Sequence, residues 1–183
     1  MAEQQQKEAL KKVPYAARDG PGTSILVGKA KELIKEIIVD PVTYLANWGR
    51  VYSLWPVHLE TACCSIEWGA VSGPRFDCER WGTLEAFGSL RQCDLIVVHG
   101  TVTRKMAPRL RWIYDQMPEP KWVLAMGACS ISGGVYFDSY NVLPGVDQIL
   151  PVDVYIPGCP PRPEMLCDAI MMLQDKIRKS GIR

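Results

Sequence analysis

Three short apolar runs that each end in glycine stand out in the second half of the chain. They are Asp94–Gly100, Lys121–Gly127 and Val152–Gly158. Strands that are buried on both faces have nearly continuous apolar sequences of this kind, and such strands occur in parallel sheets. We therefore predict three parallel strands here.

Segments with a helical spacing of apolar residues surround these strands. The pattern predicts four helices, at Lys29–Val39, Val42–Trp48, Thr103–Gln116 and Glu164–Arg178. In the last of them the expected inward stripe consists of Met165, Ala169, Met172 and Leu173. Alternation of strand and helix favours an α/β fold, which we expect to be flavodoxin-like, with a central parallel sheet of about four strands flanked by helices.

The chain has the length and composition of one globular domain. Its 183 residues are enough for a single core, and hydrophobic and charged residues make up an ordinary 48% and 22%. Residues 1–22 are polar and end in Gly20-Pro21-Gly22. We therefore predict a mobile N-terminal arm over residues 1–22 and a single domain over residues 23–183.

The charge pattern limits the possible partners. A formal net charge of +1 argues against a general affinity for nucleic acid. Basic residues gather only locally, at Arg104, Lys105, Arg109 and Arg111, which we interpret as a solvated helix face. The N-terminus has no apolar leader, and no window approaches the roughly 20 apolar residues that a spanning helix needs. We expect an intracellular protein that reaches the cytoplasmic face of the membrane by docking to an integral partner.

The seven cysteines are many for an intracellular chain. An odd number and a reducing compartment disfavour structural disulfides, so metal binding becomes the leading explanation for some of them. We interpret Cys93 and Cys167 as small buried apolar residues. Cys129 and Cys159 follow directly after two predicted strands, and the carboxyl ends of parallel strands meet at one edge of a sheet. These two thiols should therefore lie at the same edge.

Cys63 and Cys64 are adjacent, which is unusual for metal ligands because neighbouring side chains diverge in regular structure. Both could face one metal centre at the beginning of a helix. We predict such a helix from Cys63 to Val71, with Thr61 as its cap. The positive end of a helix also favours an anionic, thiolate-ligated cluster.

The loops around the other two cysteines restrict the chemistry. Gly127–Gly134 is glycine-rich, and a flavin phosphate loop is the alternative there, although the Gly-Lys-Ser/Thr ending of a P-loop is missing. Prolines stiffen the loop around Cys159 and provide no N–H groups near its sulfur. Four thiolates suit either zinc or an iron–sulfur cluster, and the lack of paired Cys-x-x-Cys knuckles favours the cluster over structural zinc.

Several longer stretches match one known family. They are Trp48–Arg50, Ser53–Pro56, Ala62–Glu67, Lys105–Pro108, Tyr114–Pro118, Met126–Cys129, Gly133–Gly134 and Pro151–Glu164. On these stretches the chain resembles the cluster-bearing small subunit of respiratory complex I, the PSST or 20 kDa subunit. The resemblance extends from Trp48 to Lys176 and covers most of the chain.

The resemblance implies that Cys63, Cys64, Cys129 and Cys159 ligate the terminal 4Fe–4S cluster of the electron chain, called N2. In the family this cluster reduces a quinone in a pocket shared with the large, 49 kDa-type subunit, and that step drives proton pumping. The expected partners are this large subunit, a two-cluster ferredoxin-like subunit and a membrane-embedded quinone-site subunit. Small subunits of membrane-bound nickel–iron hydrogenases are related and are the alternative, but they usually lack the adjacent cysteine pair.

The chain departs from the family pattern at several positions. His58–Thr61 replaces the usual Phe-Gly-Leu, Trp68 and Gly69 follow Glu67 in place of methionine, and Cys78 stands where methionine is usual. These changes fall where the family forms its acceptor pocket, and our pocket candidates are Trp68, Arg75, Phe76, Cys78 and Trp81. Because large aromatic faces can stack on a flat ring system, we hypothesise an archaeal relative that oxidises reduced coenzyme F420 and reduces methanophenazine. The alternative is that these aromatics belong to a subunit interface.

Some ionisable residues are candidates for proton transfer. Glu67 lies one helical turn after Cys64 and could take up a proton when a cluster is reduced, or it could form a surface ion pair. Asp153 and Glu164 have the same two interpretations. His58 and His99 are further candidates for metal or proton work.

Overall fold

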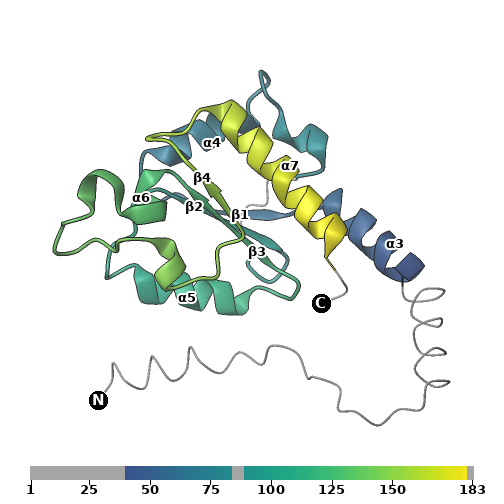
Figure 1. Cartoon of the computed structure of the whole chain (residues 1–183), viewed down its shortest axis with the longest axis horizontal. Helices are drawn as coiled ribbons and strands as arrows, with labels where there is room; N and C mark the ends of the chain where they lie inside the picture. Colours follow the sequence, from purple (N-terminus) through teal and green to yellow (C-terminus); the bar gives the residue numbers. More distant parts are fainter. Residues whose placement is uncertain (1–39, 84–88, 181–183) are drawn as a thin grey trace, which may run out of the picture. The chain divides into compact units, whose positions relative to one another are not determined.

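The computed structural model describes residues 40–83 and 89–180, which belong to the compact unit Pro41–Arg183 apart from Asp40 (Figure 1). The predicted arm, residues 1–22, and the predicted helix Lys29–Val39 lie outside the described residues. Within the described ranges, no helix combines the length and the apolar character required to cross a bilayer.

A four-stranded parallel sheet forms the centre of this unit. Its strands lie in chain order: β1 (Pro56–Leu59), β2 (Leu95–His99), β3 (Trp122–Met126) and β4 (Val154–Ile156). The three predicted strands and the α/β fold are confirmed. The sequence pattern does not predict β1, because its four residues include a proline and a histidine and form no apolar run.

The helices of the described residues are α3 (Asp40–Val51), α4 (Cys64–Ser72), α5 (Ala107–Gln116), α6 (Ala128–Ser132) and α7 (Pro163–Lys179). Short 3-10 helices are η2 (Cys78–Trp81), η3 (Gly134–Tyr136) and η4 (Val146–Gln148). The predictions Thr103–Gln116 and Glu164–Arg178 correspond to α5 and α7. The prediction Val42–Trp48 corresponds to the longer α3, where Pro41 occupies the first turn and its missing N–H costs no helical hydrogen bond.

Helices cover both faces of the sheet (Figure 1). On one face, α4 and α7 pack together, and Val97 and Leu124 are buried against side chains such as Ile170. On the other face, Ile96 is buried with Leu110 of α5. Every residue of β2 and β3 is buried, which explains why neither strand alternates between apolar and polar positions.

The inward face of α7 differs from the predicted stripe. Ala169 and Leu173 are buried as predicted, but Met165 and Met172 are 39% and 63% exposed. The buried apolar side chains on α7 are Leu166, Cys167, Ala169, Ile170, Leu173 and Ile177. The prediction is wrong for the two methionines because apolar residues occur at helical spacing on two overlapping faces, and only packing against the sheet selects one.

A lysine closes the carboxyl end of α5. The Lys121 ammonium donates to the carbonyls of Tyr114 at 3.0 Å and Met117 at 3.3 Å, and it lies 4.1 Å from the centre of the Tyr114 ring. It also pairs with Glu119 at 3.3 Å. The last carbonyls of a helix have no partners within the helix, so this cation satisfies them and fixes the turn into β3.

Candidate cysteine site

The adjacent cysteines lie at the beginning of α4, shortly after the carboxyl end of β1. Cys63 precedes the helix, with φ −58° and ψ −22°, and Cys64 is its first residue. Cys63 is exposed and Cys64 is buried. Thr61 does not cap this helix, since its hydroxyl donates to the carbonyl of His99 at 2.7 Å. The predicted helix is present, but the predicted cap is wrong: Thr61 joins the loop to β2 instead.

Glycines leave space for two of the sulfur atoms. Gly127, directly after β3, has a φ of +91°, and a Cβ atom there would lie 2.5 Å from Sγ of Cys64. Gly134 has a φ of +53°, and a Cβ atom there would lie 3.0 Å from Sγ of Cys129. Glycine adopts a positive φ without the strain that a side chain causes. The missing side chains at Gly127 and Gly134 therefore leave room for the sulfur atoms of Cys64 and Cys129.

The loop after β4 is hydrogen-bonded to the loop after β3. The N–H of Ala128 donates to the carbonyl of Gly158 at 2.7 Å, and the N–H of Gly127 donates to that of Ile156 at 2.9 Å. Gly158 directly precedes Cys159, and Ala128 directly precedes Cys129. The structure thus places both cysteines at the carboxyl edge of the sheet, where Cys159 is exposed and Cys129 is buried.

The other three thiols at this edge affect the pKa of Cys64. Burial raises the pKa of Cys64 to about 12, and the neighbouring Cys63, Cys129 and Cys159 contribute to the same shift. Among the described residues, no group of three or more His, Cys, Asp or Glu side chains is arranged to hold a single metal ion. The contributions to the pKa of Cys64 indicate that the four thiols are neighbours.

The remaining three cysteines lie elsewhere in the core. Cys78 of η2 and Cys167 of α7 are buried. Burial is the main cause that raises the pKa of Cys167, and the nearby Cys78 contributes to the same shift. Cys93 is buried just before β2, where burial and then Asp94 raise its pKa. The interpretation of Cys93 and Cys167 as small buried residues is confirmed.

Ser130 joins the ends of β2 and β3 beneath the cysteines. Its buried hydroxyl donates to the carbonyl of Gly100 at 2.7 Å and accepts from the N–H of the same residue at 3.0 Å. The carbonyls of Val98 and Met126 lie 3.1 and 2.9 Å from this oxygen. Sequence reasoning does not identify Ser130, because one serine in a glycine-rich loop forms no distinctive pattern.

Buried aromatic nitrogens lie at the end of β2 and on α4. His99, at the end of β2, is fully buried, and neither ring nitrogen makes a hydrogen bond of ordinary geometry among the described residues. Trp68, one helical turn after Cys64, is 2% exposed, and its ring lies 5.4 Å from that of His99. Burial lowers the pKa of His99 to about 3, the charge of His58 acts in the same direction, and the backbone of Leu59 opposes it. The imidazole of His99 is therefore neutral near pH 7.

The pocket candidates occupy different environments. Trp68 and Cys78 lie in the core, each 2% exposed, and Trp81 packs partly buried against that core. Arg75 is exposed, and its guanidinium lies 5.6 Å from the ring centre of Phe76. Side chains buried in the core, such as Trp68 and Cys78, support the residues that line a pocket but do not contact a ligand themselves. Within this unit Arg75, Phe76 and Trp81 are therefore the candidates able to touch a ligand, and the pocket itself stays a prediction.

The candidate carboxylates also differ. Asp153 accepts the N–H of Val123 at 2.9 Å and pairs with Lys176 at 2.7 Å, which is a structural role between β3 and α7. Glu164 is exposed and forms a pair of 3.5 Å with Arg162. Glu67 is partly exposed, and its side chain forms no ion pair or hydrogen bond within the described part of the chain.

Sequence comparison establishes the relationship that the resemblance implies. Residues 62–173 match the family described as NADH ubiquinone oxidoreductase, 20 Kd subunit. The chain belongs to this family. A subunit of the NADH-quinone oxidoreductase of Salinispora tropica is 54% identical over 144 residues, which cover 79% of this chain and 77% of that protein. The corresponding NADH-quinone oxidoreductase subunit of Phocaeicola vulgatus is 49% identical over 173 residues, which cover 94% and 87%.

Solved structures agree with the family and the fold. A chain of the membrane-bound sulfane sulfur reductase, an archaeal respiratory membrane complex, is 44% identical with a TM-score of 0.71 and matches over 75% of this chain and 77% of that one. A chain of the NAD+-reducing nickel–iron hydrogenase in the H2-reduced state has a TM-score of 0.51 at 19% identity, over 69% and 93%. At that identity the likeness concerns the fold alone.

Proposed function

We propose that this chain is the electron-transfer subunit of a complex I-like, proton-translocating oxidoreductase, with one 4Fe–4S cluster held by Cys63, Cys64, Cys129 and Cys159. The observation that supports this most is the grouping of these four thiols, apart from the three core cysteines, at the carboxyl edge of the sheet. Relatives named as subunits of NADH-quinone oxidoreductase support the type of enzyme.

The donor set and its surroundings fit such a cluster. Cysteine thiolates are the usual ligands of iron–sulfur clusters, and four are available here. The four thiols lie near one another, since Cys63, Cys129 and Cys159 each contribute to the raised pKa of Cys64. The lack of a side chain at Gly127 and Gly134 leaves room beside Cys64 and Cys129.

The chain's residues give the site an inner and an outer side. A cluster bound here would supply one-electron chemistry, with the protein contributing ligands, burial and field. Cys64 and Cys129 are buried, whereas Cys63 and Cys159 are exposed, so a redox partner can approach from the outer side. Metal binding requires the thiolate form of each Sγ. Ligation therefore displaces the proton that burial otherwise holds on Cys64.

We propose a membrane quinone as the electron acceptor, because the curated relatives are named quinone oxidoreductases. Methanophenazine, with reduced F420 as the donor, is the second candidate, and it rests on the aromatic pocket candidates Phe76 and Trp81, which are only partly buried, and on the likeness to a chain of an archaeal respiratory complex. The proposed partners are a large 49 kDa-type subunit, a two-cluster ferredoxin-like subunit and a membrane-embedded subunit. The proposed location is the cytoplasmic face of the membrane.

The test is a redox titration of the purified complex followed by low-temperature EPR. The proposal predicts a 4Fe–4S signal that appears on reduction, decays when acceptor is added and is missing in Cys63→Ala. Cys93→Ala is the matched control, because Cys93 is buried just before β2 and should leave the signal unchanged. Zinc at the site, or an unchanged signal in Cys63→Ala, would contradict the proposal. A strong preference for ubiquinone over a phenazine would rule out the methanophenazine hypothesis alone.

A further inference from the structure

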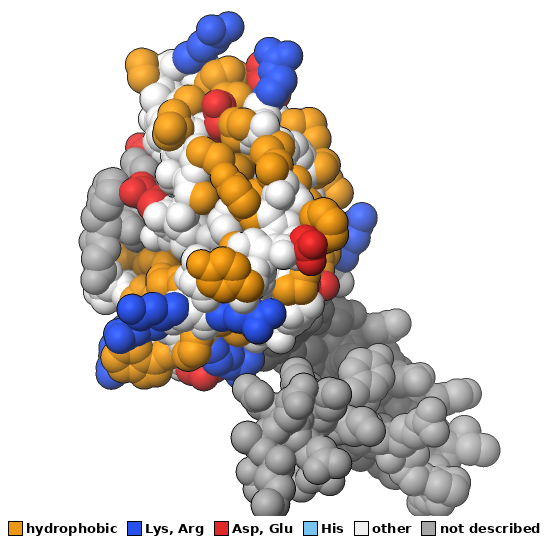
Figure 2. Space-filling view, turned by 90° about the vertical axis from the view of Figure 1, so that its left-hand side faces the viewer, with side chains coloured by type: hydrophobic (Ala, Val, Ile, Leu, Met, Phe, Trp, Pro, Cys, Tyr) orange, Lys and Arg blue, Asp and Glu red, His pale blue; other side chains and the backbone are white. Residues whose placement is uncertain are grey.

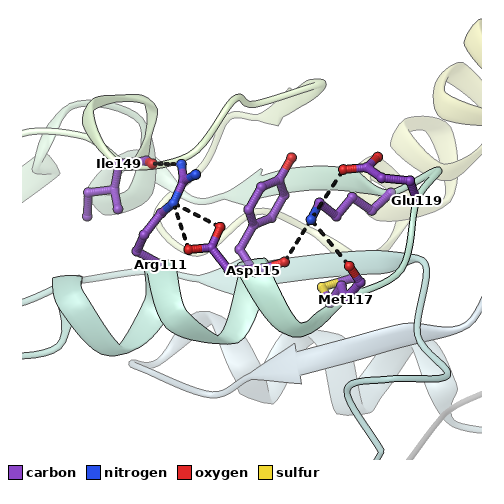
Figure 3. Close-up of polar contacts among 7 residues, drawn as sticks. Arg111, Asp115, Met117, Glu119 and Ile149 are labelled. Atoms are coloured by element: carbon purple, nitrogen blue, oxygen red, sulfur yellow. Dashed lines mark hydrogen bonds and ion pairs between the residues drawn. The ribbon is translucent and has the colours of Figure 1, made fainter. Parts of the chain in front are cut away.

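Three cations around the beginning of α5 have no acidic partner in the part of the chain that the structure describes. Arg104, Lys105 and Arg109 are exposed, and their side chains form no ion pair or hydrogen bond within residues 40–83 and 89–180. Arg111 differs, since it pairs with Asp115 at 3.1 Å (Figure 3). Of the four cations on the predicted solvated face, Arg111 is paired with a carboxylate, and the other three are not paired within the described residues.

The position of these cations is unfavourable for the helix itself. The first turn of α5 contains no acidic residue, and Arg109 lies within it. The amino end of a helix has a partial positive charge, so cations there cost stability and acids would be preferred. A local charge pattern that opposes the fold without compensation is expected at positions with another role.

Three exposed aromatic residues and an exposed valine lie on a segment that is joined to the one carrying the cations. Val135, Tyr136, Phe137 and Tyr140 are 75%, 55%, 69% and 91% exposed. Their segment is hydrogen-bonded to the one that precedes α5: the N–H of Arg104 donates to the carbonyl of Asn141 at 2.9 Å. An antiparallel bridge also joins Thr103 to Val142. Figure 2 shows hydrophobic side chains across one face of the unit, with Lys and Arg side chains along its lower edge and also at its top and right, and a few Asp and Glu side chains among them.

The aromatic segment is continuous with the cysteine site. The N–H of Gly133 donates to the carbonyl of Cys129 at 3.0 Å. A Cβ atom on Gly133, which has a φ of +80°, would lie 2.8 Å from Cα of Phe137. The backbone at Phe137 therefore packs directly against Gly133, the residue that follows α6. A molecule that docks on this segment lies next to α6, the short helix that contains Cys129.

We propose that these residues form a docking face for an acidic surface of a protein partner in the electron-transfer assembly. The basic–aromatic face consists of Arg104, Lys105, Arg109, Tyr136, Phe137 and Tyr140. Arginine and tyrosine are the residues that dominate binding at protein interfaces, and uncompensated cations select an acidic partner and speed its approach. An anionic membrane usually requires a longer basic run, of roughly four to eight residues, so a protein is the favoured occupant. This inference rests on the proposed electron-transfer function.

The experiment is zero-length cross-linking of the intact, detergent-solubilised complex with a carbodiimide, which joins lysine amines to carboxylates. Lys105 should be recovered joined to Asp or Glu residues of another subunit. The exposed Lys179 of α7 is the control and should show at least about fivefold fewer such links. Cross-links from Lys105 only to this chain, or none, would overturn the proposal.

Charge reversal gives the second measurement. Lys105→Glu/Arg109→Glu should lower retention of the linked subunit about tenfold at moderate salt, whereas Arg91→Glu/Lys179→Glu, with the same change in charge, should not. If the first pair instead weakens binding of the complex to phosphatidylglycerol vesicles and leaves the subunits together, the face binds lipid and the proposal is wrong. The cluster EPR signal should persist in both double variants. If the EPR signal is absent from the unaltered complex, the proposed function is wrong. That outcome is independent of the cross-linking and charge-reversal results, which test the docking face.

Discussion

A Cβ atom on Gly127 would lie 2.5 Å from Sγ of Cys64, so the residue that follows β3 leaves room for a sulfur atom at the beginning of α4. The two positions are far apart in sequence, and only the sheet brings them together. The site therefore depends on an absent side chain as well as on the thiols.

Replacement of Gly127 by alanine should damage both fold and site. The new methyl group would meet Cys64 and the backbone would be held at a φ of +91°, so we expect the free energy of unfolding to fall by about 1–3 kcal/mol and the iron content of the complex to fall with it. Thermal unfolding and iron analysis measure these effects. Gly69→Ala is the control, since Gly69 is helical with nothing within 4 Å of its Cβ position, and it should be neutral or stabilising. Equal behaviour of the two variants would contradict this expectation.

His99 should make the protein sensitive to acid. Its pKa falls from 6.5 to about 3 on folding, so the unfolded chain binds a proton more readily. Stability from this group is complete above pH 6.5 and is lost as the pH falls from there towards 3. His99→Phe keeps an aromatic ring and should reduce that loss, measured by urea unfolding between about pH 3 and 7. An unchanged pH profile would show that His99 is not the group responsible.

Asp94 should act in the opposite direction. Burial raises its pKa from 3.8 to about 6, so the folded chain binds the proton more tightly, and the free energy of unfolding falls as the pH rises from about 4 to about 6. Asp94→Asn preserves an oxygen that can accept the N–H of Trp55, now bonded at 2.7 Å. We expect the variant to lose this decline in the same urea titration. If the decline persists in Asp94→Asn, its source is another group.

Lys121→Met should destabilise the carboxyl end of α5. Methionine can fill the space of the aliphatic stem but cannot donate to the carbonyls of Tyr114 and Met117, so we expect a loss of about 1–3 kcal/mol. Arg111→Met removes exposed contacts of the same helix, namely the pair with Asp115 and the hydrogen bond to the carbonyl of Ile149 at 3.3 Å, and should cost less, about 0.5–1 kcal/mol. Chemical unfolding of both variants compares them directly. Equal losses would argue against the end-closing role of Lys121.

The parts of the fold that could be predicted are those with a strong local pattern. β2 and β3 are apolar because helices cover both faces of the sheet, and this burial is visible in the sequence. β4 is also an apolar run, although Tyr155 in its middle is exposed. β1 is short and contains His58, which is partly buried among other aromatic rings, so it has no such pattern. The inward face of α7 is ambiguous in the sequence because Met165 and Leu166 are both apolar, and tertiary packing alone excludes the methionine.

The candidate site shows the same division. Cys129 and Cys159 could be predicted to share an edge because each follows a strand, and the position of Cys64 at the beginning of a helix follows from its adjacency to Cys63. The roles of Ser130 and of the buried ring of His99 depend on atoms brought together from separate strands and helices. Such contacts leave no periodic signal in the sequence, so only the three-dimensional arrangement shows them.

The most direct test of the central claim is the EPR signal of the reduced complex in seven single variants, each with one cysteine replaced by alanine. We predict that the signal is lost or altered in the variants of Cys63, Cys64, Cys129 and Cys159. We predict an unchanged signal in assembled complexes with replacements at Cys78, Cys93 or Cys167. A normal signal in any variant of the first group, or a lost signal in an intact complex with a replacement from the second group, would contradict the claim.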